Sequence, residues 1–486
     1  GYSEVTVFEA APSPGGMLLL GIPEYRLPRG LIRSEIDDIL SMGVNLKLNT
    51  KLGKDITLSA LKEESFEAIF IALGAHKNNP MGLEGEDLDG VISGIDFLRE
   101  INLGNPVKIG QRVAVIGGGN VALDAVRIAL RIGETDNLAI DAIRTAARLG
   151  AKDAFILYRR SREEMPASED EIEDAEEEGV HIQYMVSPTR IIGKNGKVRA
   201  IQCMRMELGE LDDSGRRRPL PIAGSKFSID VDTVIPAIGQ VSDLSFIGDV
   251  DGIQTTKAGT IEVNHNTLAT AAPGIFAGGD VAFGPRIIID AVKDGHRAAR
   301  SIDRYLHKGK TNIVVRAALA EAADRELPAD SELEIQKQKA PAVPVERRTG
   351  VSEVELAYDE NTAREQASRC LSCNVQTVFD ADLCILCGGC VDACPQSCYK
   401  MVSLKSIEGD QRVRDSIEAR YGIALEEFQN EDGKSIQGTA MIKDETRCVR
   451  CSLCATRCPT GAITMKAFWF EEELAHEVVK SKAHNR

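Results

Sequence analysis

The chain has 486 residues, enough for about three domains, and its 43% hydrophobic and 27% charged content is typical of a soluble globular protein. Its net charge of −16 argues against non-specific nucleic-acid binding, and no apolar run approaches the roughly 18 residues of a transmembrane helix. Eleven of its twelve cysteines follow residue 369, which favours metal binding in a reducing cytoplasm over a secreted disulfide framework.

The N-terminal segment is typical of the second strand of a dinucleotide-binding domain. Val5 to Phe8 form an apolar strand, and Glu9 at its end is suited to hold the hydroxyl pair of an adenosine ribose. No glycine-rich loop precedes it, and the missing strand and loop would occupy about 25 residues upstream. We therefore expect an N-terminally truncated chain. The alternative is that another chain supplies the loop.

The clearest glycine-rich loop begins at Gly117, between an apolar strand at 113–116 and a helical stretch at 123–132. Gly117 allows the tight turn, Gly119 lets the backbone approach a pyrophosphate, and Ala122 keeps helix and strand close. The positive end of the helix then faces the phosphates. This pattern predicts a dinucleotide site, followed by an extra helical stretch at 135–150.

The next strand, at 154–158, ends in Arg159 and Arg160. An acidic residue there would bind the ribose 2′-hydroxyl of NAD, whereas guanidinium groups suit a 2′-phosphate. We therefore predict NADPH in preference to NADH, with these two arginines as the discriminating pair. The alternative is a solvated basic turn that balances Glu163 and Glu164.

Two apolar strands, at 66–75 and 232–239, each run into a glycine, as expected where the chain crosses between two nucleotide domains. Farther on, Gly278 and Gly279 permit a close approach of the backbone to a ligand, and Asp280 can accept a ribityl hydroxyl. A helix is expected to continue to about Leu306, and its positive end can stabilise negative charge on a reduced flavin ring.

Residues 307–350 change in character, with many charges and a Pro/Ala stretch at 339–344. They predict a linker with one helical patch at 315–325. A short helix at 361–369 is expected to deliver Cys370.

Two cysteine runs near the C-terminus carry the C-x2-C-x2-C-x3-C-P spacing of bacterial ferredoxins. In this spacing three thiolates bind one four-iron cluster and the fourth reaches the other cluster. The sequence therefore predicts two [4Fe–4S] clusters. One is assigned to Cys384, Cys387, Cys390 and Cys458, and the other to Cys448, Cys451, Cys454 and Cys394. A disulfide scaffold or a zinc ribbon is disfavoured, because zinc sites use two separated pairs.

The other four cysteines are less informative. Cys203 stands alone before residue 369, so we expect a packed core thiol and no redox-active disulfide. Cys370 and Cys373 are too few for a cluster of their own. They could join an additional cluster with a partner chain or with Cys398, or remain unligated.

Segments 15–28, 117–124, 158–167 and 274–280 together resemble the glutamate synthase small-subunit family. That family includes the flavin subunits of NADPH:ferredoxin oxidoreductases and the N-terminal half of dihydropyrimidine dehydrogenase. The resemblance covers residues 1–310 and returns at 354–373. It implies an α/β fold in which a Rossmann-like FAD domain is split by a Rossmann-like NADPH domain. Here, unlike in most family members, the α+β ferredoxin-like domain follows the flavin domains.

This organisation gives the expected domain bounds: 1–106 and 229–308 for FAD, 107–228 for NADPH, 309–365 for a linker, and 366–486 for the ferredoxin domain with an insertion near 400–440, acidic at 426–434. The expected cofactor-binding residues are Glu9, Gly16, Met17, Arg26, Gly74, Gly117, Gly119, Asn120, Val121, Arg159, Arg160, Gly239, Gly279, Asp280 and Ile287.

These expectations predict a cytoplasmic NADPH oxidoreductase that uses FAD and two [4Fe–4S] clusters. Flavin converts paired electrons to single ones, which pass to a ferredoxin or a partner subunit, compatible with an oligomeric complex. One alternative is the electron-input subunit of a complex, with glutamate synthase, aldehyde, formate or aromatic-ring chemistry in another chain. Another alternative is a non-catalytic scaffold that carries clusters. Neither nucleic acid nor membrane insertion is expected.

Overall fold

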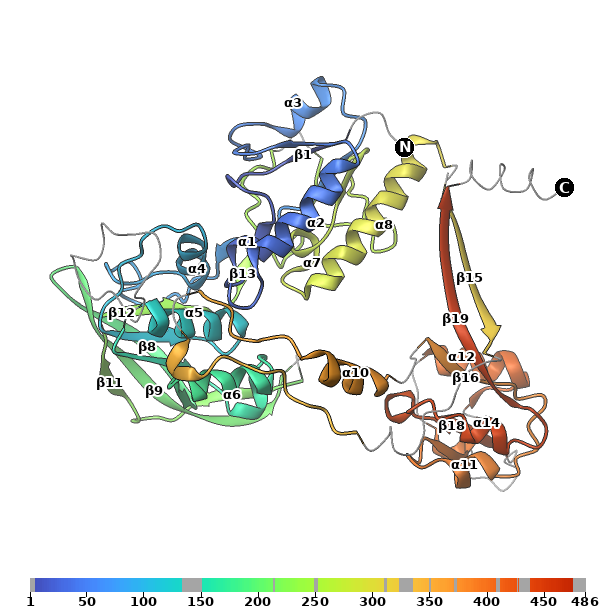
Figure 1. Ribbon diagram of the computed structural model, residues 1–486. Coiled ribbons are helices and arrows are strands. Elements are labelled where there is room, and N and C mark those ends of the chain that lie inside the picture. The colour runs from blue at the N-terminus through green and yellow to red at the C-terminus, as the bar shows by residue number, and fades with distance from the viewer. Residues whose placement is uncertain are drawn as a thin grey trace. The chain divides into compact units, whose positions relative to one another are not determined.

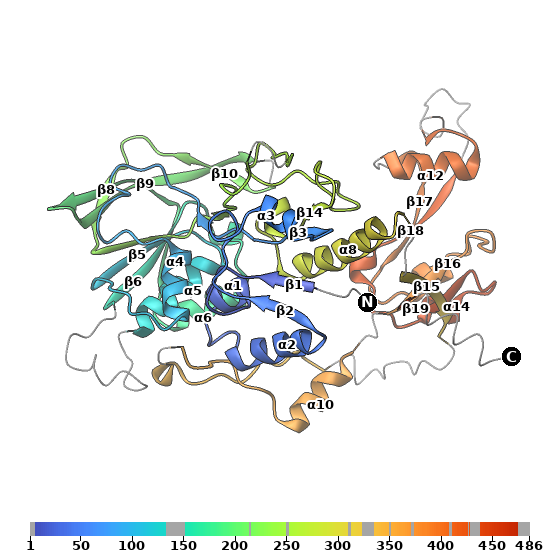
Figure 2. The same cartoon turned by 90° about the horizontal axis from the view of Figure 1, so that it is seen from above.

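The computed structural model describes residues 5–132, 151–212, 215–248, 252–309, 313–322, 335–348, 351–370, 374–407, 411–425, 427 and 438–474 (Figures 1 and 2). The chain divides into two compact units, Gly1–Thr311 with Ala340–Ala357, and Asn312–Lys339 with Tyr358–Arg486. Within the described residues, no helix has the length and apolar character needed to cross a membrane.

A parallel sheet forms the centre of the first unit. Its strands lie in the order β12 (Thr233–Pro236), β5 (Arg112–Ile116), β6 (Asp153–Tyr158) and β7 (His181–Tyr184). Helix α5 (Asn120–Arg131) packs on β5 and β6, with α4 (Gly94–Asn102) and α6 (Glu169–Glu177) beside it. β5, β6 and β12 are almost wholly buried, as apolar strands covered on both faces require. The strands predicted at 113–116 and 154–158 and the helix between them are confirmed. The chain leaves this sheet only after Pro236, whereas the expected boundary lay at residue 228.

An antiparallel sheet follows β7. β9 (Lys197–Leu211) is its long central strand, flanked by β8 (Val186–Lys194), β10 (Arg217–Pro221) and β11 (Phe227–Asp230). Cys203 lies in β9 with no exposed surface, and burial raises the pKa of its thiol to about 12. The prediction of a packed core thiol is confirmed.

The rest of the first unit contains short parallel pairs, β1 (Val5–Phe8) with β2 (Val44–Lys47), and β3 (Ile69–Ile71) with β14 (Ile275–Ala277). This part of the unit also contains five helices, α1 (Gly16–Leu20), α2 (Arg29–Ser41), α3 (Leu58–Glu63), α7 (Asp280–Phe283) and α8 (Ile288–Leu306). The helix predicted to reach Leu306 is therefore confirmed. β4 (Lys77–Asn78) pairs with β13 (Gln240–Val241), so the two connections to the central sheet run side by side.

The second unit is built from a duplicated motif. β16 (Val375–Phe379), α11 (Gly389–Ala393) and β17 (Tyr399–Ser403) form one half, and β18 (Thr439–Lys443), α14 (Leu453–Arg457) and β19 (Ile463–Leu474) form the other. β16 pairs with β19 and β17 with β18, so each half completes the sheet of the other. Left-handed backbone recurs at matching places, at 386 and 450, 388 and 452, and 397 and 461. The expected ferredoxin-like duplication is present.

One predicted element is wrong. The helical patch at 315–325 falls largely on a strand, β15 (Ile313–Glu321), that pairs antiparallel with β19. Its β-branched residues and the aromatic partners Phe468, Trp469 and Phe470 favour a pleated ribbon over the helix suggested by its alanines. The predicted helix at 361–369 is confirmed as α10 (Glu360–Ser368), and the insertion near 400–440 contains α12 (Gln411–Tyr421). The stretches predicted at 135–150 and, except for Glu427, at 426–434 lie outside the described residues.

Candidate functional site

The glycine-rich turn after β5 needs its first two glycines for packing. Gly117 has φ +145°, and a Cβ there would lie 2.3 Å from the carbonyl oxygen of Ala237. A Cβ on Gly118 would lie 2.5 Å from the Tyr158 ring. The surrounding protein atoms therefore leave no room for a side chain at either position, whether or not a ligand is bound.

Gly119 is different, because its backbone is extended and the nearest atom to an added Cβ is Pro166 Cγ at 3.8 Å. Gly119 is also the N-cap of α5, without a side-chain cap, and Asn120 and Val121 form the first turn of that helix. The fold would accept a methyl group at this position. Its glycine instead suits the close approach of an anionic ligand to the helix N-terminus.

The segment after β6 folds back over this turn. The Tyr158 hydroxyl donates to the Glu164 carbonyl (2.6 Å), and the Ala167 amide donates to the Gly118 carbonyl (3.3 Å). These bonds fix the strand end, where the two predicted arginines lie, next to the glycine-rich turn.

The two arginines have different surroundings. Arg160 is 5% exposed, its Nη2 lies 2.6 Å from Asp212 Oδ2, and its Nε donates to the Arg217 carbonyl (2.8 Å). Arg160 therefore anchors β9 and β10 to the strand end, and its guanidinium is committed to protein groups. The Arg159 side chain is exposed at the end of β6.

Two acids stand at strand ends in the expected flavin half. Glu9 follows β1, and its carboxylate accepts a hydrogen bond from the Ala11 amide (2.8 Å). Asp280 follows β14 and accepts from the Arg286 amide (3.1 Å), and burial raises the pKa of its carboxyl group. Gly279, just before it, has φ +68°. Acids at parallel strand ends suit the hydroxyl groups of a dinucleotide.

The other predicted flavin contacts lie at turns and helix starts. Gly74 and Gly239, both with positive φ, lie in the two connections to the central sheet, where the Asn79 amide donates to the Gly239 carbonyl (3.0 Å). Gly16 and Met17 begin α1. Ile287 is the N-cap residue of α8 and is 68% exposed.

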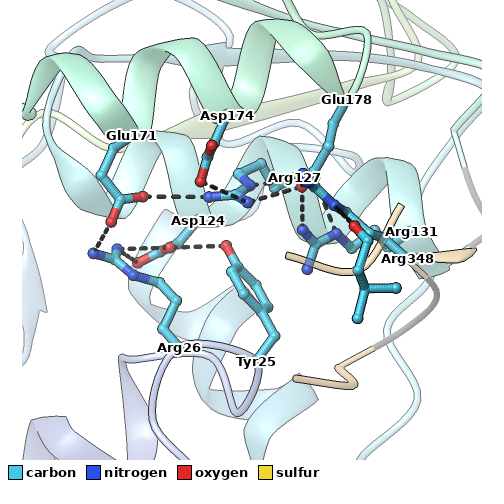
Figure 3. Close-up of polar contacts among 10 residues, drawn as sticks. Tyr25, Arg26, Asp124, Arg127, Arg131, Glu171, Asp174, Glu178 and Arg348 are labelled. Atoms are coloured by element: carbon cyan, nitrogen blue, oxygen red, sulfur yellow. Dashed lines mark hydrogen bonds and ion pairs between the residues drawn. The ribbon is translucent and has the colours of Figure 1, made fainter. Parts of the chain in front are cut away.

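Arg26 was predicted to bind a cofactor, but the structure pairs it with protein carboxylates (Figure 3). Its Nη1 lies 3.0 Å from Asp124 Oδ1, and its Nη2 pairs with Glu171. The Tyr25 hydroxyl donates to the same Asp124 oxygen (3.0 Å), and the Arg131 guanidinium lies 4.0 Å from the centroid of the Tyr25 ring. Arg26 thus joins the turn after α1 to helices α5 and α6.

Next to these contacts lies a buried cluster of charged side chains around Glu178, the C-cap residue of α6 (Figure 3). Its carboxylate accepts from Arg127 Nη2 (2.8 Å), Arg131 Nε (3.0 Å) and Arg348 Nη1 (2.8 Å), and all four side chains are 3–6% exposed. Burial alone would raise the pKa of Glu178, but the hydrogen bonds from Arg127 and Arg131 outweigh it and lower the pKa to about 2. The sequence held one signal of this cluster, because Asp124, Arg127 and Arg131 repeat at helical spacing, as do the acids Glu171, Asp174 and Glu178.

In the second unit, the eight ferredoxin cysteines line two open cavities. The first cavity is lined by Cys384, Cys387, Cys390 and Cys458, and the second by Cys394, Cys448, Cys451 and Cys454. These are the two groupings expected from the spacing. Among the described residues, no three His, Cys, Asp or Glu side chains converge as closely as a single metal ion requires. Four thiols around a wider space fit the donor set of a four-iron cluster.

Of the remaining cysteines, Cys398 also lines the second cavity. It is 3% exposed, and its amide donates to Cys394 Sγ (3.2 Å). Cys370 is exposed, and Cys373 lies outside the described residues.

Family models match both parts of the chain. Residues 32–295 match the pyridine nucleotide-disulphide oxidoreductase model, and residues 383–462 match the 4Fe-4S dicluster domain model. The second match contains all eight cavity-lining cysteines of the ferredoxin spacing.

Known relatives extend this result. The chain is 44% identical to the NADP(+)-dependent formate dehydrogenase subunit beta of Moorella thermoacetica, over 77% of this chain and 51% of that protein. It is 33% identical to the glutamate synthase [NADPH] small chain of Escherichia coli, over 62% of this chain and 64% of that one. The expected resemblance to glutamate synthase small subunits is confirmed. The chain spans about half the length of the formate dehydrogenase subunit.

Among solved structures, FprA of Mycobacterium tuberculosis in complex with NADPH has a TM-score of 0.53 at 20% identity, covering 63% of this chain and 78% of that one. This likeness supports the expected two-domain α/β fold of the first unit.

Proposed function

The chain belongs to the pyridine nucleotide-disulphide oxidoreductase family, and on that premise we propose that it passes electrons between NADPH and an acceptor protein by way of FAD and two [4Fe–4S] clusters. The observation that carries the proposal is the pair of cysteine-lined cavities on the same chain as a glycine-rich dinucleotide turn. The segment matching the family model contains a single cysteine, the buried Cys203, so the chain has no thiol pair there for disulfide chemistry.

In this proposal, the NADPH pyrophosphate lies at Gly119 and the first turn of α5, and the exposed guanidinium of Arg159 receives the 2′-phosphate. Glu9 and Asp280 bind hydroxyl groups of FAD, with Gly16, Met17, Gly74, Gly239, Gly279 and Ile287 around it. Bound flavin supplies the exchange between hydride and single electrons, and bound clusters supply one-electron storage. The role of the protein residues is to orient these groups.

The acceptor is proposed to be a ferredoxin or a partner subunit. The names of the relatives, a "subunit beta" and a "small chain", favour a chain that feeds electrons to a separate catalytic subunit. Purified full-length protein should then reduce a one-electron dye with NADPH but not turn over formate or glutamine with 2-oxoglutarate. Failure to reduce any dye with NADPH, in protein with full flavin and iron content, would contradict the proposal.

Replacing Gly119 with alanine should separate ligand binding from folding. The fold has room for the methyl group, so the thermal midpoint should stay within about 2 °C of wild type, a shift worth less than roughly 1 kcal/mol. The methyl group would, however, occupy the space that a pyrophosphate approaches, and we expect NADPH to bind at least about tenfold more weakly. Titration calorimetry and a melting curve measure the two effects.

Gly117→Ala is the matched control for that experiment, because its Cβ would collide with a carbonyl oxygen at 2.3 Å. This variant should lose stability whether or not NADPH is present. If Gly119→Ala binds NADPH with wild-type affinity, the assignment of the pyrophosphate site is wrong.

Replacing Arg159 with alanine should change coenzyme preference. We expect an affinity loss of about tenfold or more for NADPH and little change for NADH, because only NADPH carries the 2′-phosphate. Steady-state kinetics with both coenzymes measure the ratio. Arg160→Ala is the control, since its guanidinium holds Asp212 and the β10 backbone, and it should reduce stability without favouring either coenzyme. If Arg159→Ala lowers the affinity for NADPH and NADH equally, Arg159 does not bind the 2′-phosphate.

A further inference from the structure

The two cysteine-lined cavities are related by the duplication, so their linings can be compared place by place. The halves match strand for strand and helix for helix, β16 with β18, α11 with α14, and β17 with the start of β19. The matching positions around the first and second cavities include Phe379 and Lys443, Leu386 and Arg450, Met441 and Thr377, Ala462 and Cys398, and Ile463 and Tyr399. In each pair the residue near the first cavity is apolar, whereas its counterpart near the second cavity is a cation (Lys443, Arg450), a hydroxyl-bearing residue (Thr377, Tyr399) or a cysteine (Cys398).

The first cavity has a mostly apolar wall apart from its cysteines. Phe379, Ile385, Met441, Ala462 and Ile463 line it, and Thr460, whose hydroxyl lies 3.7 Å from Cys458 Sγ, is its uncharged polar lining residue. The backbone turn between Cys384 and Cys387 carries Leu386, whose φ of +52° is left-handed. Arg457 lies beside this cavity, near Gly389, and its side chain is exposed to solvent, which screens its charge.

The second cavity has a cation in its wall. Arg450 lines it from the turn between Cys448 and Cys451, with φ +59°, the same left-handed conformation as at Leu386. The Arg450 side chain is 15% exposed, and its Nη1 donates to the Cys448 carbonyl (2.8 Å). The guanidinium is therefore held against the backbone of a proposed cluster ligand.

A second cation lies behind the same wall. Lys443 Nζ lies 2.5 Å from Thr377 Oγ1, and Thr377 itself lines the cavity and accepts from the Tyr399 hydroxyl (3.2 Å). The Lys443 side chain is 13% exposed. At the place of Lys443, the first half of the duplication has Phe379, which cannot carry charge.

An exposed anion pairs with both of these cations. Glu445 pairs with Lys443 (2.7 Å) and with Arg450 (3.7 Å), but its side chain is 54% exposed. Water screens an exposed carboxylate more strongly than two largely buried cations. The surroundings of the second cavity are therefore more positive than those of the first.

We propose that Arg450 and Lys443 make the cluster held by Cys448, Cys451, Cys454 and Cys394 the stronger electron acceptor of the two. The inference rests on the proposed binding of clusters in both cavities. An added electron makes a cluster more negative, so nearby positive charge stabilises the reduced form and raises its potential. With clusters bound in both cavities, transfer of one electron from the first to the second would be favoured, and it would form or break no bond and move no proton.

The test is a redox titration of anaerobically prepared full-length protein, followed by electron paramagnetic resonance. Arg450→Leu gives the second cavity the residue of the first, in a backbone conformation that Leu386 already adopts. We expect one of two midpoint potentials to fall, so that the equilibrium between the clusters shifts by about tenfold, equivalent to 59 mV for one electron. Leu386→Arg is the reciprocal variant and should raise the other midpoint. The iron content of each variant is measured alongside.

Arg457→Leu is a further control, because an exposed cation should shift a midpoint by much less than Arg450 does. Unchanged midpoints in both Arg450→Leu and Lys443→Phe, with full iron content, would overturn this inference and leave the cluster proposal intact. A rise in a midpoint in Arg450→Leu would overturn it as well. Wild-type protein without iron would overturn the cluster proposal and this inference together.

Discussion

Replacing Glu178 with glutamine is expected to lower the free energy of unfolding of the first unit by about 3–5 kcal/mol. The wild-type carboxylate accepts hydrogen bonds from three arginines, Arg127, Arg131 and Arg348, whose side chains are at most 6% exposed. A neutral amide would leave three cations buried together without their common counter-charge. Chemical denaturation followed by far-UV circular dichroism measures the change. Tryptophan fluorescence does not suit this purpose, since the single tryptophan, Trp469, belongs to the second unit.

Glu176→Gln is the matched control, from the same helix. Glu176 pairs with Arg162, but both side chains are partly exposed, at 39% and 29%, so this pair should contribute at most about 1 kcal/mol. If Glu178→Gln lowers the free energy of unfolding no more than Glu176→Gln does, the buried cluster does not hold helix α6 and residues 340–357 in place.

The same carboxylate gives the wild-type protein a dependence on acid. Its pKa falls from the usual 4.5 to about 2 on folding, because hydrogen bonds from arginines outweigh the effect of burial. A depressed pKa stabilises the folded state fully above pH 4.5, and this contribution is lost as the pH falls towards 2. Glu178→Gln should therefore lose less stability than wild type between about pH 4.5 and pH 2. If the stability of both proteins falls equally over this pH range, the lowered pKa of Glu178 is wrong.

Replacing Cys454 with alanine is expected to remove one cluster. Cys454 lines the second cavity, is 8% exposed and is one of the four thiols of the ferredoxin spacing there, and an ordinary cluster needs all four of these ligands. Iron analysis of anaerobically reconstituted protein should fall from about eight to about four atoms per chain. Reduction of flavin by NADPH should persist, while reduction of a protein acceptor should fall by at least about tenfold, since the proposed exit is broken.

Cys203→Ala controls for the loss of a buried thiol. Cys203 lies in the core of the first unit and lines neither cavity, so its variant should keep about eight irons. Full iron content in Cys454→Ala, or equal iron loss in both variants, would contradict the assignment of the second cavity.

The features that were predicted correctly from the sequence are those that residues close together in the chain determine. The strand, turn and helix around Gly117 have local periodicity and steric requirements, and both appear in β5 and α5. The cysteine spacing also predicted that Cys458 would join the first trio, because the fourth cysteine of such a run binds the other cluster.

The sequence did not reveal features that depend on partners distant in the chain. β15 has alanines that favour a helix, but its pairing partner, β19, lies about 150 residues later. Arg159 and Arg160 are neighbours in one motif, but only Arg160 is buried, where it pairs with Asp212 about 50 residues later in the chain. The ion pairs of Arg26 with Asp124 and Glu171 were not visible in the sequence, because these acids lie about 100 and 145 residues later on helices α5 and α6.

The most direct test of the proposed electron path is an anaerobic titration of full-length, reconstituted protein with NADPH. Flavin absorbance and the paramagnetic signals of reduced clusters are followed in the same samples. We predict that NADPH bleaches the flavin and that cluster signals from a protein with about eight irons appear in step with it. Bleached flavin with clusters that dithionite reduces but NADPH leaves oxidised would contradict a path between them, as would cysteines at 384–394 and 448–458 that bind no iron.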